Sequence, residues 1–403
     1  MRLPYKEKLC LAIFCAFIYF LDLQAQPFAI GKTTITFIDG ARNNRTIETD
    51  IYYPALQAGT NVPVAGGANT RFPVISFGHG FVMSVDAYAN VRNMLVPEGY
   101  IIALPKTESS FSPSHANFGR DLSFVIDTIT KLNEINNSIF FSKVDNMNCV
   151  MGHSMGGGAA HLAAAGNTKI KAIATLAAAE TNPSAIGAAG TLQIPALVFA
   201  GSNDCVTPPA NHQTLIYNAL NSSCKTYITI KGGSHCQMAE SNFNCNFGEA
   251  TCSPAPSITR AQQHTVIKSY LIPWLNYQLK KDCNAARAFD NLMKNDNAIS
   301  FQNNCSFCVV SQAGDLREFS HQIVYPNPFK ESIYIAPVKT GTAPVYVTLK
   351  SVDGKVYRMR EKISQAIYNG SLQIPTGQLT TGFYILQIQT ADKTDTYKLI
   401  KTN

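Results

Sequence analysis

One five-residue stretch constrains the fold of this chain more than any other feature: GHSMG at 152–156. It follows the apolar residues 148–151 and precedes an alanine-rich run, so we expect a strand that turns abruptly into a helix. The pattern G-x-S-x-G is typical of such a turn, because flanking glycines let neighbouring backbone approach closely. The turn would hold Ser154 in a strained, exposed position, which predicts a nucleophile. The alternative is an ordinary serine in a glycine-rich connection.

Strand-like and helix-like segments alternate along residues 26–283. Runs of β-branched, aromatic or small apolar residues predict strands at 32–40, 45–55, 72–81, 100–107, 148–151, 170–180, 194–204 and 225–235. Apolar residues at helical spacing predict helices at 118–135, 210–222 and 258–282, the last interrupted at Pro273. This alternation predicts βαβ units and a mostly parallel sheet flanked by helices.

A nucleophilic serine needs a base, and the base needs a carboxylate that orients it. After this type of elbow the acid precedes the histidine in the chain. Asp204 ends the predicted strand 194–204, and His235 ends the next, so both are expected at the edge where catalytic loops lie. Glu180 is the competing acid, but Asp204 has turn-forming neighbours that can bring it to the histidine.

The other histidines fit the role of base less well. His115 precedes the elbow, which is the wrong order, and His153 within the elbow is expected to line the cleft. Four further histidines are expected on predicted helices or in the second domain: His161, His212, His264 and His321.

The sequence GHGF at 78–81 follows an early predicted strand, where one oxyanion donor is expected. We assign that donor to the N–H of Phe81 and the other to the N–H of Met155, at the start of the predicted helix. A plain tight turn is the alternative explanation of these glycines.

Residues 1–25 are typical of a signal peptide. Arg2, Lys6 and Lys8 precede an apolar run, and Ala25 is a suitable cleavage point. The run is short for a membrane span. We therefore expect an exported mature protein that starts near Gln26 and has no membrane span.

Nine of the 11 cysteines lie outside this segment. Cys149 is expected to be a buried free thiol, and the other eight to form four disulfides in an oxidising compartment. Eight cysteines allow 105 pairings, so connectivity stays open. A Cys205–Cys236 bond would clamp acid and base together, but local pairings of Cys205 with Cys224, and of Cys236 with Cys245 or Cys252, are favoured. A zinc site at 305–308 is less favoured than disulfides.

The chain of 403 residues is long enough for two domains, and its net charge of +7 is dispersed, so nothing indicates nucleic-acid binding. Residues 284–320 are polar and predict an irregular extension and linker. Residues 321–403 contain short strand-like runs separated by turns, which predict a small all-β sandwich.

Four stretches, GHGF, GHSMGGGAA, GSNDCVTPP and GGSHC, together resemble the dienelactone hydrolase, chlorophyllase and bacterial cutinase part of the α/β-hydrolase superfamily. The resemblance is greatest to cutinases and poly(ethylene terephthalate) hydrolases and covers about residues 30–283. It implies an α/β-hydrolase fold, ester hydrolysis without metal or cofactor, and a hydrophobic or polymeric ester substrate. Phe81, His153, Met155 and Val206 match the substrate-binding cleft walls of that family.

One departure from that family concerns aromatic polyesters. Its polyester hydrolases usually have a tryptophan where Glu180 or Thr181 stands, whereas the single tryptophan here is Trp274. A lipase or an esterase for small esters is therefore an alternative. A non-catalytic surface-binding protein that kept the fold is another.

The C-terminal stretches YPNPF, GFYILQIQT and KLIK resemble the type IX secretion sorting domain. That resemblance implies export across an outer membrane by the type IX machinery, followed by removal of the domain. A carbohydrate- or surface-binding sandwich is the alternative.

Overall fold

The computed structural model describes residues 27–308, 323–336, 346–351, 355–359, 367–368, 371–389 and 394–402. The chain forms two compact units, residues 1–309 and 310–403. The expected signal peptide lies outside the described residues, as does the part of the expected linker from 309 to 320.

A ten-stranded sheet organises the first unit, in the order β10-β9-β8-β7-β6-β4-β5-β2-β1-β3. Its strands are β1 (Ala29–Asp39), β2 (Arg45–Ala55), β3 (Gly59–Thr60), β4 (Phe72–Gly78), β5 (Ile101–Pro105), β6 (Val144–His153), β7 (Ile173–Leu176), β8 (Ala196–Gly201), β9 (Lys225–Ile230) and β10 (Ile299–Asn303). Neighbouring strands from β5 to β9 run parallel, while β1, β2 and β10 pair antiparallel. The predicted mostly parallel sheet is confirmed.

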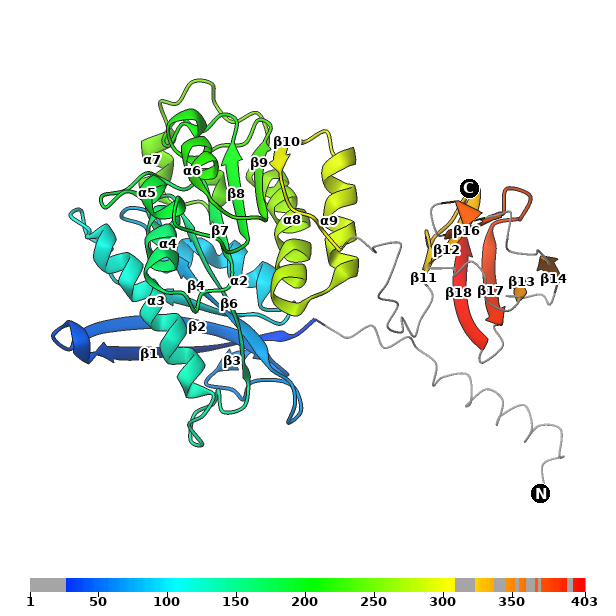
Figure 1. The fold of residues 1–403 in the computed structure, drawn as a ribbon, viewed down its shortest axis with the longest axis horizontal. Helices are drawn as coiled ribbons and strands as arrows, with labels where there is room; N and C mark the ends of the chain where they lie inside the picture. Colours follow the sequence, from blue (N-terminus) through cyan, green and yellow to red (C-terminus); the bar gives the residue numbers. More distant parts are fainter. Residues whose placement is uncertain are drawn as a thin grey trace, which may run out of the picture. The chain divides into compact units, whose positions relative to one another are not determined.

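Helices cover both faces of this sheet (Figure 1). They are α2 (Ala89–Leu95), α3 (His115–Leu132), α4 (Met155–Gly166), α5 (Ala185–Ala189), α6 (Gln213–Ala219), α7 (Phe243–Glu249), α8 (Arg260–Lys280) and α9 (Cys283–Asn295). Successive side chains of a strand point to opposite faces. Accordingly, Met151 of β6 packs in one core with α2, α8 and α9, and Val150 packs in another with α3 to α6. This layered arrangement confirms the α/β-hydrolase fold.

Helix α8 runs through Pro273 without the predicted interruption. A proline inside a helix removes a hydrogen bond and crowds the preceding turn. The helix nevertheless buries Tyr270, Leu271 and Trp274 completely. Burial of such large side chains stabilises the helix enough to keep it continuous.

Residues 284–303 were expected to be irregular, and this is wrong. They form α9 and β10, and β10 pairs antiparallel with β9. Phe289 and Met293 of α9 are buried against α8, and the Phe289 ring meets Tyr270 edge-on at 5.8 Å. The polar composition hid a one-sided apolar face, so the hydrolase unit extends beyond residue 283.

Four disulfides are present, as expected, and Cys149 is a buried free thiol. The pairs are Cys205–Cys252, Cys224–Cys305, Cys236–Cys245 and Cys283–Cys308. The expected Cys205–Cys224 pair and the Cys205–Cys236 clamp are both wrong. The expected pairing of Cys236 with Cys245 is confirmed. Cys205 instead bonds to Cys252, just beyond α7, which the sequence pattern did not place beside it.

The second unit contains two four-stranded sheets, as predicted for a small β domain. One orders β11 (Ile323–Tyr325), β12 (Ser332–Ala336), β16 (Ser371–Pro375) and β15 (Ile367–Tyr368); the other orders β14 (Val356–Met359), β13 (Tyr346–Ser351), β17 (Gly382–Gln389) and β18 (Thr394–Lys401). Ile333 and Ile335 of the first sheet share one core with Leu386 and Ile388 of the second, which is the packing of a sandwich.

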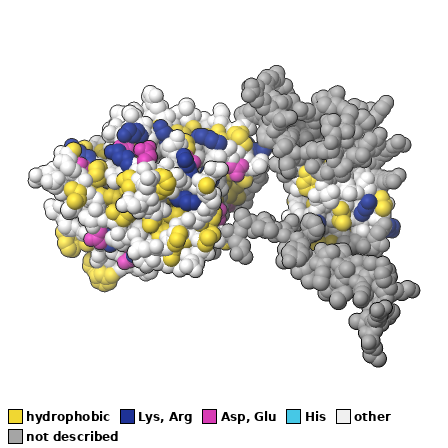
Figure 2. Space-filling view, turned by 90° about the horizontal axis from the view of Figure 1, so that it is seen from below, with side chains coloured by type: hydrophobic (Ala, Val, Ile, Leu, Met, Phe, Trp, Pro, Cys, Tyr) yellow, Lys and Arg dark blue, Asp and Glu magenta, His cyan; other side chains and the backbone are white. Residues whose placement is uncertain are grey.

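On the face of the hydrolase unit seen in Figure 2, basic, acidic and apolar side chains are interspersed. That face therefore carries no continuous basic stripe of the kind that binds nucleic acid. Within the described part of the chain, no helix combines the length and apolar character needed to span a bilayer.

Candidate active site

Ser154 stands at the junction of β6 and α4 with an unusual backbone conformation. Its φ of 56° and ψ of −124° lie in a region that residues other than glycine rarely adopt. Its N–H donates to the Leu176 carbonyl at 3.0 Å, and its carbonyl accepts from Gly158 at 3.1 Å and Ala179 at 2.9 Å. These bonds from β7 and α4 hold the strained turn and keep Ser154 at the edge of the sheet.

Two glycines make this turn sterically possible. A Cβ on Gly152 would lie 2.2 Å from the Gly156 carbonyl oxygen, and a Cβ on Gly156 would lie 2.1 Å from the Gly78 carbonyl oxygen. Real Cβ atoms do not approach backbone so closely. The glycines therefore let α4 begin directly against the end of β4, which carries the GHGF turn.

His235 and Asp204 meet in the interior of the site. Nδ1 of His235 lies 2.8 Å from Oδ2 of Asp204, and both side chains are almost completely buried. The other oxygen of Asp204 accepts from the N–H groups of Val206 at 2.9 Å and Thr207 at 2.8 Å. When Nδ1–H of His235 donates a hydrogen bond to this carboxylate, the other ring nitrogen, Nε2, is the one that can take up a proton, as a base must.

The loops that carry these two residues are also joined through the backbone. The N–H of Asn203 donates to the Gly233 carbonyl at 2.8 Å, and Gly201 packs against Gly233. The elbow also packs against His235, because the ring centroids of His153 and His235 lie 4.7 Å apart. Among the described residues, Ser154 Oγ makes no hydrogen bond to His235. The structure thus brings acid and base into direct contact and places the serine on the adjoining turn.

Thr207 is a contact of the acid and base that the sequence analysis missed. Its hydroxyl donates to Asp204 Oδ2 at 2.9 Å, lies 3.0 Å from His235 Nδ1, and accepts from Gln213 Nε2 at 3.0 Å. Gln213 in turn donates to the Ala178 carbonyl at 2.7 Å. Thr207 is a positioning residue that fixes the carboxylate. The turn after Asp204 was the available signal, because aspartate side chains commonly accept from backbone N–H groups about two residues further on.

The two expected oxyanion donors lie at the start of α4 and on the turn after β4. Met155 is the first residue of α4, and the first N–H groups of a helix have no acceptor within it. The neighbouring Gly80 N–H is already used, because it donates to the Tyr88 hydroxyl at 2.7 Å. The N–H of Phe81 has no acceptor among the described residues, and its side chain is 49% exposed. Phe81 thus offers both an unused donor and an apolar surface.

His153 does not line the cleft as expected, because it has no exposed surface. Its Nδ1 lies 3.0 Å from the Tyr88 hydroxyl, and its Nε2 lies 3.2 Å from the His235 carbonyl oxygen. Burial, together with the nearby His235, holds the pKa of His153 well below its usual range, so the ring is neutral. It links Tyr88, which contacts the GHGF turn, to the backbone of the base. Tyr88 lies 65 residues from His153, so no sequence signal connected them.

Val206 is 40% exposed beside Asp204, so it is available as a wall residue.

The alternative acid Glu180 is engaged elsewhere, since its carboxylate accepts from the Ile186 N–H at 2.9 Å and its own N–H donates to His212 Nδ1 at 2.9 Å. Asp204, and not Glu180, is therefore the carboxylate that contacts the histidine. The single tryptophan, Trp274, is buried in α8.

A surface cavity of about 540 Å³ lies elsewhere, lined in part by Arg42, Phe124 and Leu162. Its lining includes none of Ser154, Asp204 and His235, so this cavity is not the candidate active site. Within the part of the chain that the structure describes, no group of histidine, cysteine and acidic side chains is arranged to hold a metal ion.

The family model described as PET hydrolase-like matches residues 21–253, more than half of the chain. The chain belongs to the PET hydrolase-like family. The matched segment contains the elbow, the acid and the base, and also α7 with the cysteines that anchor it.

Bacterial cutinases are similar to this PET hydrolase-like protein at low identity. Cutinase 2 of Thermobifida cellulosilytica is 22% identical over 169 residues, which cover 41% of this chain and 62% of the relative. Cutinase cut1 of Thermobifida fusca is 22% identical over 41% of this chain and 50% of the relative. Cutinase est1 of Thermobifida alba is 23% identical over 53% of this chain and 66% of the relative. The chain thus spans about half to two thirds of the length of these relatives.

The second unit has its own match. The model described as a secretion system C-terminal sorting domain covers residues 323–402. This match indicates export or cell-surface display of the protein, and it favours sorting over the carbohydrate-binding alternative for the sandwich.

Proposed function

We propose that this protein is a secreted serine carboxylic ester hydrolase that acts on hydrophobic or polymeric esters, including polyesters of the poly(ethylene terephthalate) type. The observation that carries the proposal is the 2.8 Å contact of His235 Nδ1 with Asp204 Oδ2, beside a serine with a φ of 56°. A histidine oriented by a carboxylate can activate a serine for acyl transfer once the serine hydroxyl turns to its Nε2.

In the proposed mechanism Ser154 Oγ attacks the ester carbonyl carbon while Nε2 of His235 takes the hydroxyl proton. Asp204 stabilises the imidazolium that forms, and the N–H groups of Phe81 and Met155 donate to the oxyanion. Collapse of the tetrahedral intermediate breaks the carbon–oxygen bond to the alcohol, which leaves with the proton from His235. A water molecule, deprotonated by His235, then hydrolyses the acyl-enzyme in the same way and releases the acid.

The test is the variant Ser154→Ala in the mature chain. Turnover of a soluble p-nitrophenyl ester should fall on the order of 10⁴-fold or more, because attack without the nucleophile loses most of the triad's contribution. The melting temperature should stay near that of the wild type, since the alanine removes one oxygen. Near-normal turnover in a clean preparation would exclude Ser154 as nucleophile. An inactive wild type would favour the non-catalytic surface-binding alternative.

A small-ester esterase or lipase is the second candidate, favoured by one observation. Glu180 and Thr181 stand where polyester hydrolases resembling this chain usually have a tryptophan, and both are committed to local hydrogen bonds. A substrate panel from short esters through triglycerides to polyester film separates the candidates. Release of soluble products from film supports the polyester assignment, and activity confined to short esters supports the esterase.

We also propose that residues 1–25 direct passage through the inner membrane and that the type IX machinery then exports the chain. The sorting-domain match supports the second step. A chain that ends near residue 315 should retain ester hydrolysis, because the proposed catalytic residues precede that point, and should lose export. Full export of the truncated chain would contradict this assignment of the sandwich.

A further inference from the structure

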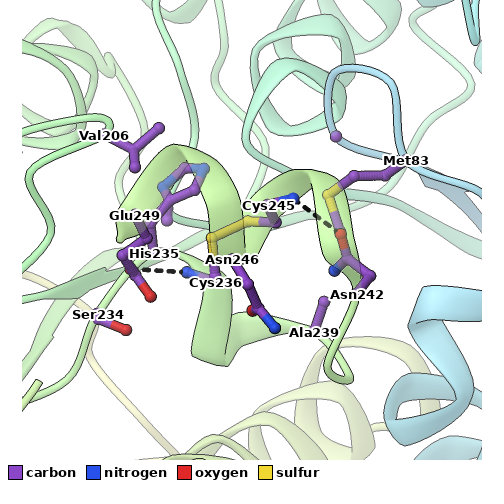
Figure 3. Close-up of a disulfide and its surroundings, with 12 residues drawn as sticks. Met83, Val206, Ser234, His235, Cys236, Ala239, Asn242, Cys245, Asn246 and Glu249 are labelled. Carbon is purple, nitrogen blue, oxygen red and sulfur yellow. Dashed lines mark hydrogen bonds between the residues drawn. A yellow bond between two sulfur atoms is a disulfide. The ribbon is translucent and has the colours of Figure 1, made fainter. Parts of the chain in front are cut away.

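Helix α7 is covalently fastened to both sides of the acid–base pair. Cys245 in α7 bonds to Cys236, the residue after His235, and Cys252 just beyond α7 bonds to Cys205, the residue after Asp204. Figure 3 shows the Cys236–Cys245 bond among its surroundings, with His235 beside Cys236. The two bonds give α7 a fixed position relative to the proposed catalytic residues.

Polar contacts attach α7 to a third loop of the site. Asn244 Nδ2 donates to the Val82 carbonyl at 2.7 Å, and Val82 directly follows Phe81. On the other side, Glu249 Oε1 accepts from the Cys236 N–H at 3.0 Å. Helix α7 therefore spans the distance between the turn with the proposed oxyanion donor and the loops with acid and base.

The contacts of α7 divide it into two faces. Cys245 and Glu249 lie one turn apart and contact Cys236. Phe243 and Phe247 are also one turn apart, on the opposite side by helical periodicity. Their side chains are 81% and 75% exposed, and their rings stack at 6.1 Å with an interplanar angle of 21°. We call Phe243 and Phe247 the α7 aromatic pair.

Core packing does not explain these phenylalanines, because α7 has no buried residue. Exposed apolar residues are common singly, whereas clustered ones mark binding surfaces. A second exposed pair lies on the loops beside Val82: Phe81 and Phe111, which is 84% exposed, have ring centroids 6.3 Å apart. Exposed aromatic side chains thus occur on both segments that meet at the Asn244–Val82 hydrogen bond.

The electrostatics of α7 indicate what could bind. Glu249 is the only charged residue between 243 and 249, and its carboxylate accepts from the Cys236 N–H on the inward side. The aromatic pair is therefore an uncharged apolar surface. Such a surface suits an uncharged apolar ligand rather than an anionic headgroup or a nucleic acid, both of which need basic side chains.

We propose that the α7 aromatic pair is a docking surface for the apolar face of a water-insoluble ester polymer, which it holds beside the proposed catalytic serine. This inference rests on the proposed function, because it assigns the insoluble substrate to the same site. The two disulfides then hold a short helix that has no fully buried residue in one place while its exposed face adsorbs to a solid. Two aromatic rings on a rigid support lose little conformational entropy when they bind.

The experiment measures adsorption without turnover. Full mature chains carrying Ser154→Ala are mixed with polycaprolactone particles, with and without the double change Phe243→Ala and Phe247→Ala. The apparent dissociation constant should rise about tenfold, equivalent to ~1.4 kcal/mol, when the aromatic pair is removed. A Phe243→Tyr, Phe247→Tyr variant keeps the rings and should adsorb nearly as well as the parent, which separates ring loss from misfolding.

Leu56→Ala is the matched control. Leu56 is 85% exposed and directly follows β2. The end of β2 lies beside the start of β5, so Leu56 is at the opposite end of the strands from the loops that carry Asp204 and His235. Its loss should leave adsorption unchanged. Equal adsorption by the double alanine variant and the Leu56→Ala control would overturn the proposal.

A second readout separates this inference from the proposed function. With Ser154 intact, the ratio of particle hydrolysis to soluble-ester hydrolysis should fall about tenfold in the double alanine variant, in line with the lost adsorption energy. An equal loss on both substrates would overturn the docking role in favour of damage to the triad. If the wild type hydrolyses no ester, the proposed function fails, and the adsorption comparison still decides whether the pair binds apolar surfaces.

Discussion

The two sides of the elbow are held by different kinds of interaction. On the side of the proposed oxyanion turn, the buried carboxylate of Asp121 in α3 binds Arg42 and Arg45, each at 2.7 Å, and accepts from the Thr107 hydroxyl at 2.6 Å. The Thr107 carbonyl oxygen lies 2.8 Å from Nε2 of His79, within the GHGF turn. A buried polar network therefore supports this turn.

On the acid–base side the support is covalent. Cys205 and Cys236, which follow Asp204 and His235, are both cross-linked to the segment around α7. Glu249 and Arg260 add hydrogen bonds to the backbone of Cys236.

Burial explains the difference between the two sides. Helix α3 buries Phe118, Leu122 and Ile126 against the sheet, so the carboxylate of its Asp121 is shielded from water, which strengthens its ion pairs. Helix α7 has no fully buried residue, and polar contacts on an exposed helix contribute little. A disulfide does not depend on burial, and an oxidising compartment lets an exported protein use one. The comparison predicts different responses when each support is removed.

The largest expected effect is that of Asp121→Ala on stability. The change leaves Arg42 and Arg45 without their shared buried carboxylate, which should lower the free energy of unfolding by about 4 kcal/mol. Urea denaturation measures it. Lys169→Ala removes an exposed partner of Asp127 and should cost less than about 1 kcal/mol. Similar losses for the two variants would show that the network beneath the oxyanion turn is not a major support.

The next effect is that of removing the Cys205–Cys252 bond by a double change to serine. A bond that spans 47 residues restrains the unfolded chain, so its loss should cost about 3 kcal/mol. The turnover number should fall as well, because Cys205 adjoins Asp204. Thermal unfolding and soluble-ester kinetics at a temperature where the variant stays folded measure the two effects.

The matched control for that variant removes Cys224–Cys305, which spans 81 residues and joins the start of β9 to the segment after β10. It should lower stability at least as much and leave the turnover number within about twofold, since the loop-entropy effect acts on the unfolded chain. Equal turnover numbers for the two disulfide variants would contradict the idea that covalent support matters specifically beside the acid.

A smaller effect is expected for Thr207→Val, which keeps the shape and removes the hydroxyl between Asp204 and His235. The turnover number should fall about tenfold, ~1.4 kcal/mol, with little change in KM, because the acid loses one of the contacts that orient it. Thr207→Ser should restore most of the rate. A rise in KM alone, or no rescue by serine, would argue against a positioning role.

The last effect is a pH dependence of stability on the elbow side. His161 of α4 is completely buried, and burial lowers its pKa to about 4. Unfolded histidine titrates near ~6.5, so the unfolded chain binds the extra proton first as the pH falls. As the pH falls from about 6.5 to about 4, protonation of His161 in the unfolded chain therefore lowers the free energy of unfolding.

The variant His161→Asn tests this pH effect. Asparagine can still donate to the Gly157 carbonyl, which lies 2.9 Å from Nδ1 of His161, but it cannot be protonated. Urea unfolding at a series of pH values should show a shallower acid slope than in the wild type. An unchanged slope would assign the acid sensitivity to other groups, with buried His153 the next to test.

Much of the fold was determined by information that is local in the chain. Strand and helix periodicity, the small residues of the elbow and the order of Ser154, Asp204 and His235 are properties of short segments, and they predicted the parallel sheet and the choice of candidate residues. The even number of cysteines outside Cys149 predicted four disulfides, because the count and the compartment do not depend on how the chain folds.

Only the tertiary structure decided which distant segments meet. The partner of Cys205, the burial of His153 against Tyr88, and the packing of α9 on α8 each join residues that no short pattern relates. A local pattern records the preferences of neighbouring residues, whereas these contacts depend on how whole elements pack. For that reason the strand-to-helix turn at Ser154 could be predicted from five residues, while the position of α7 and its aromatic pair could not.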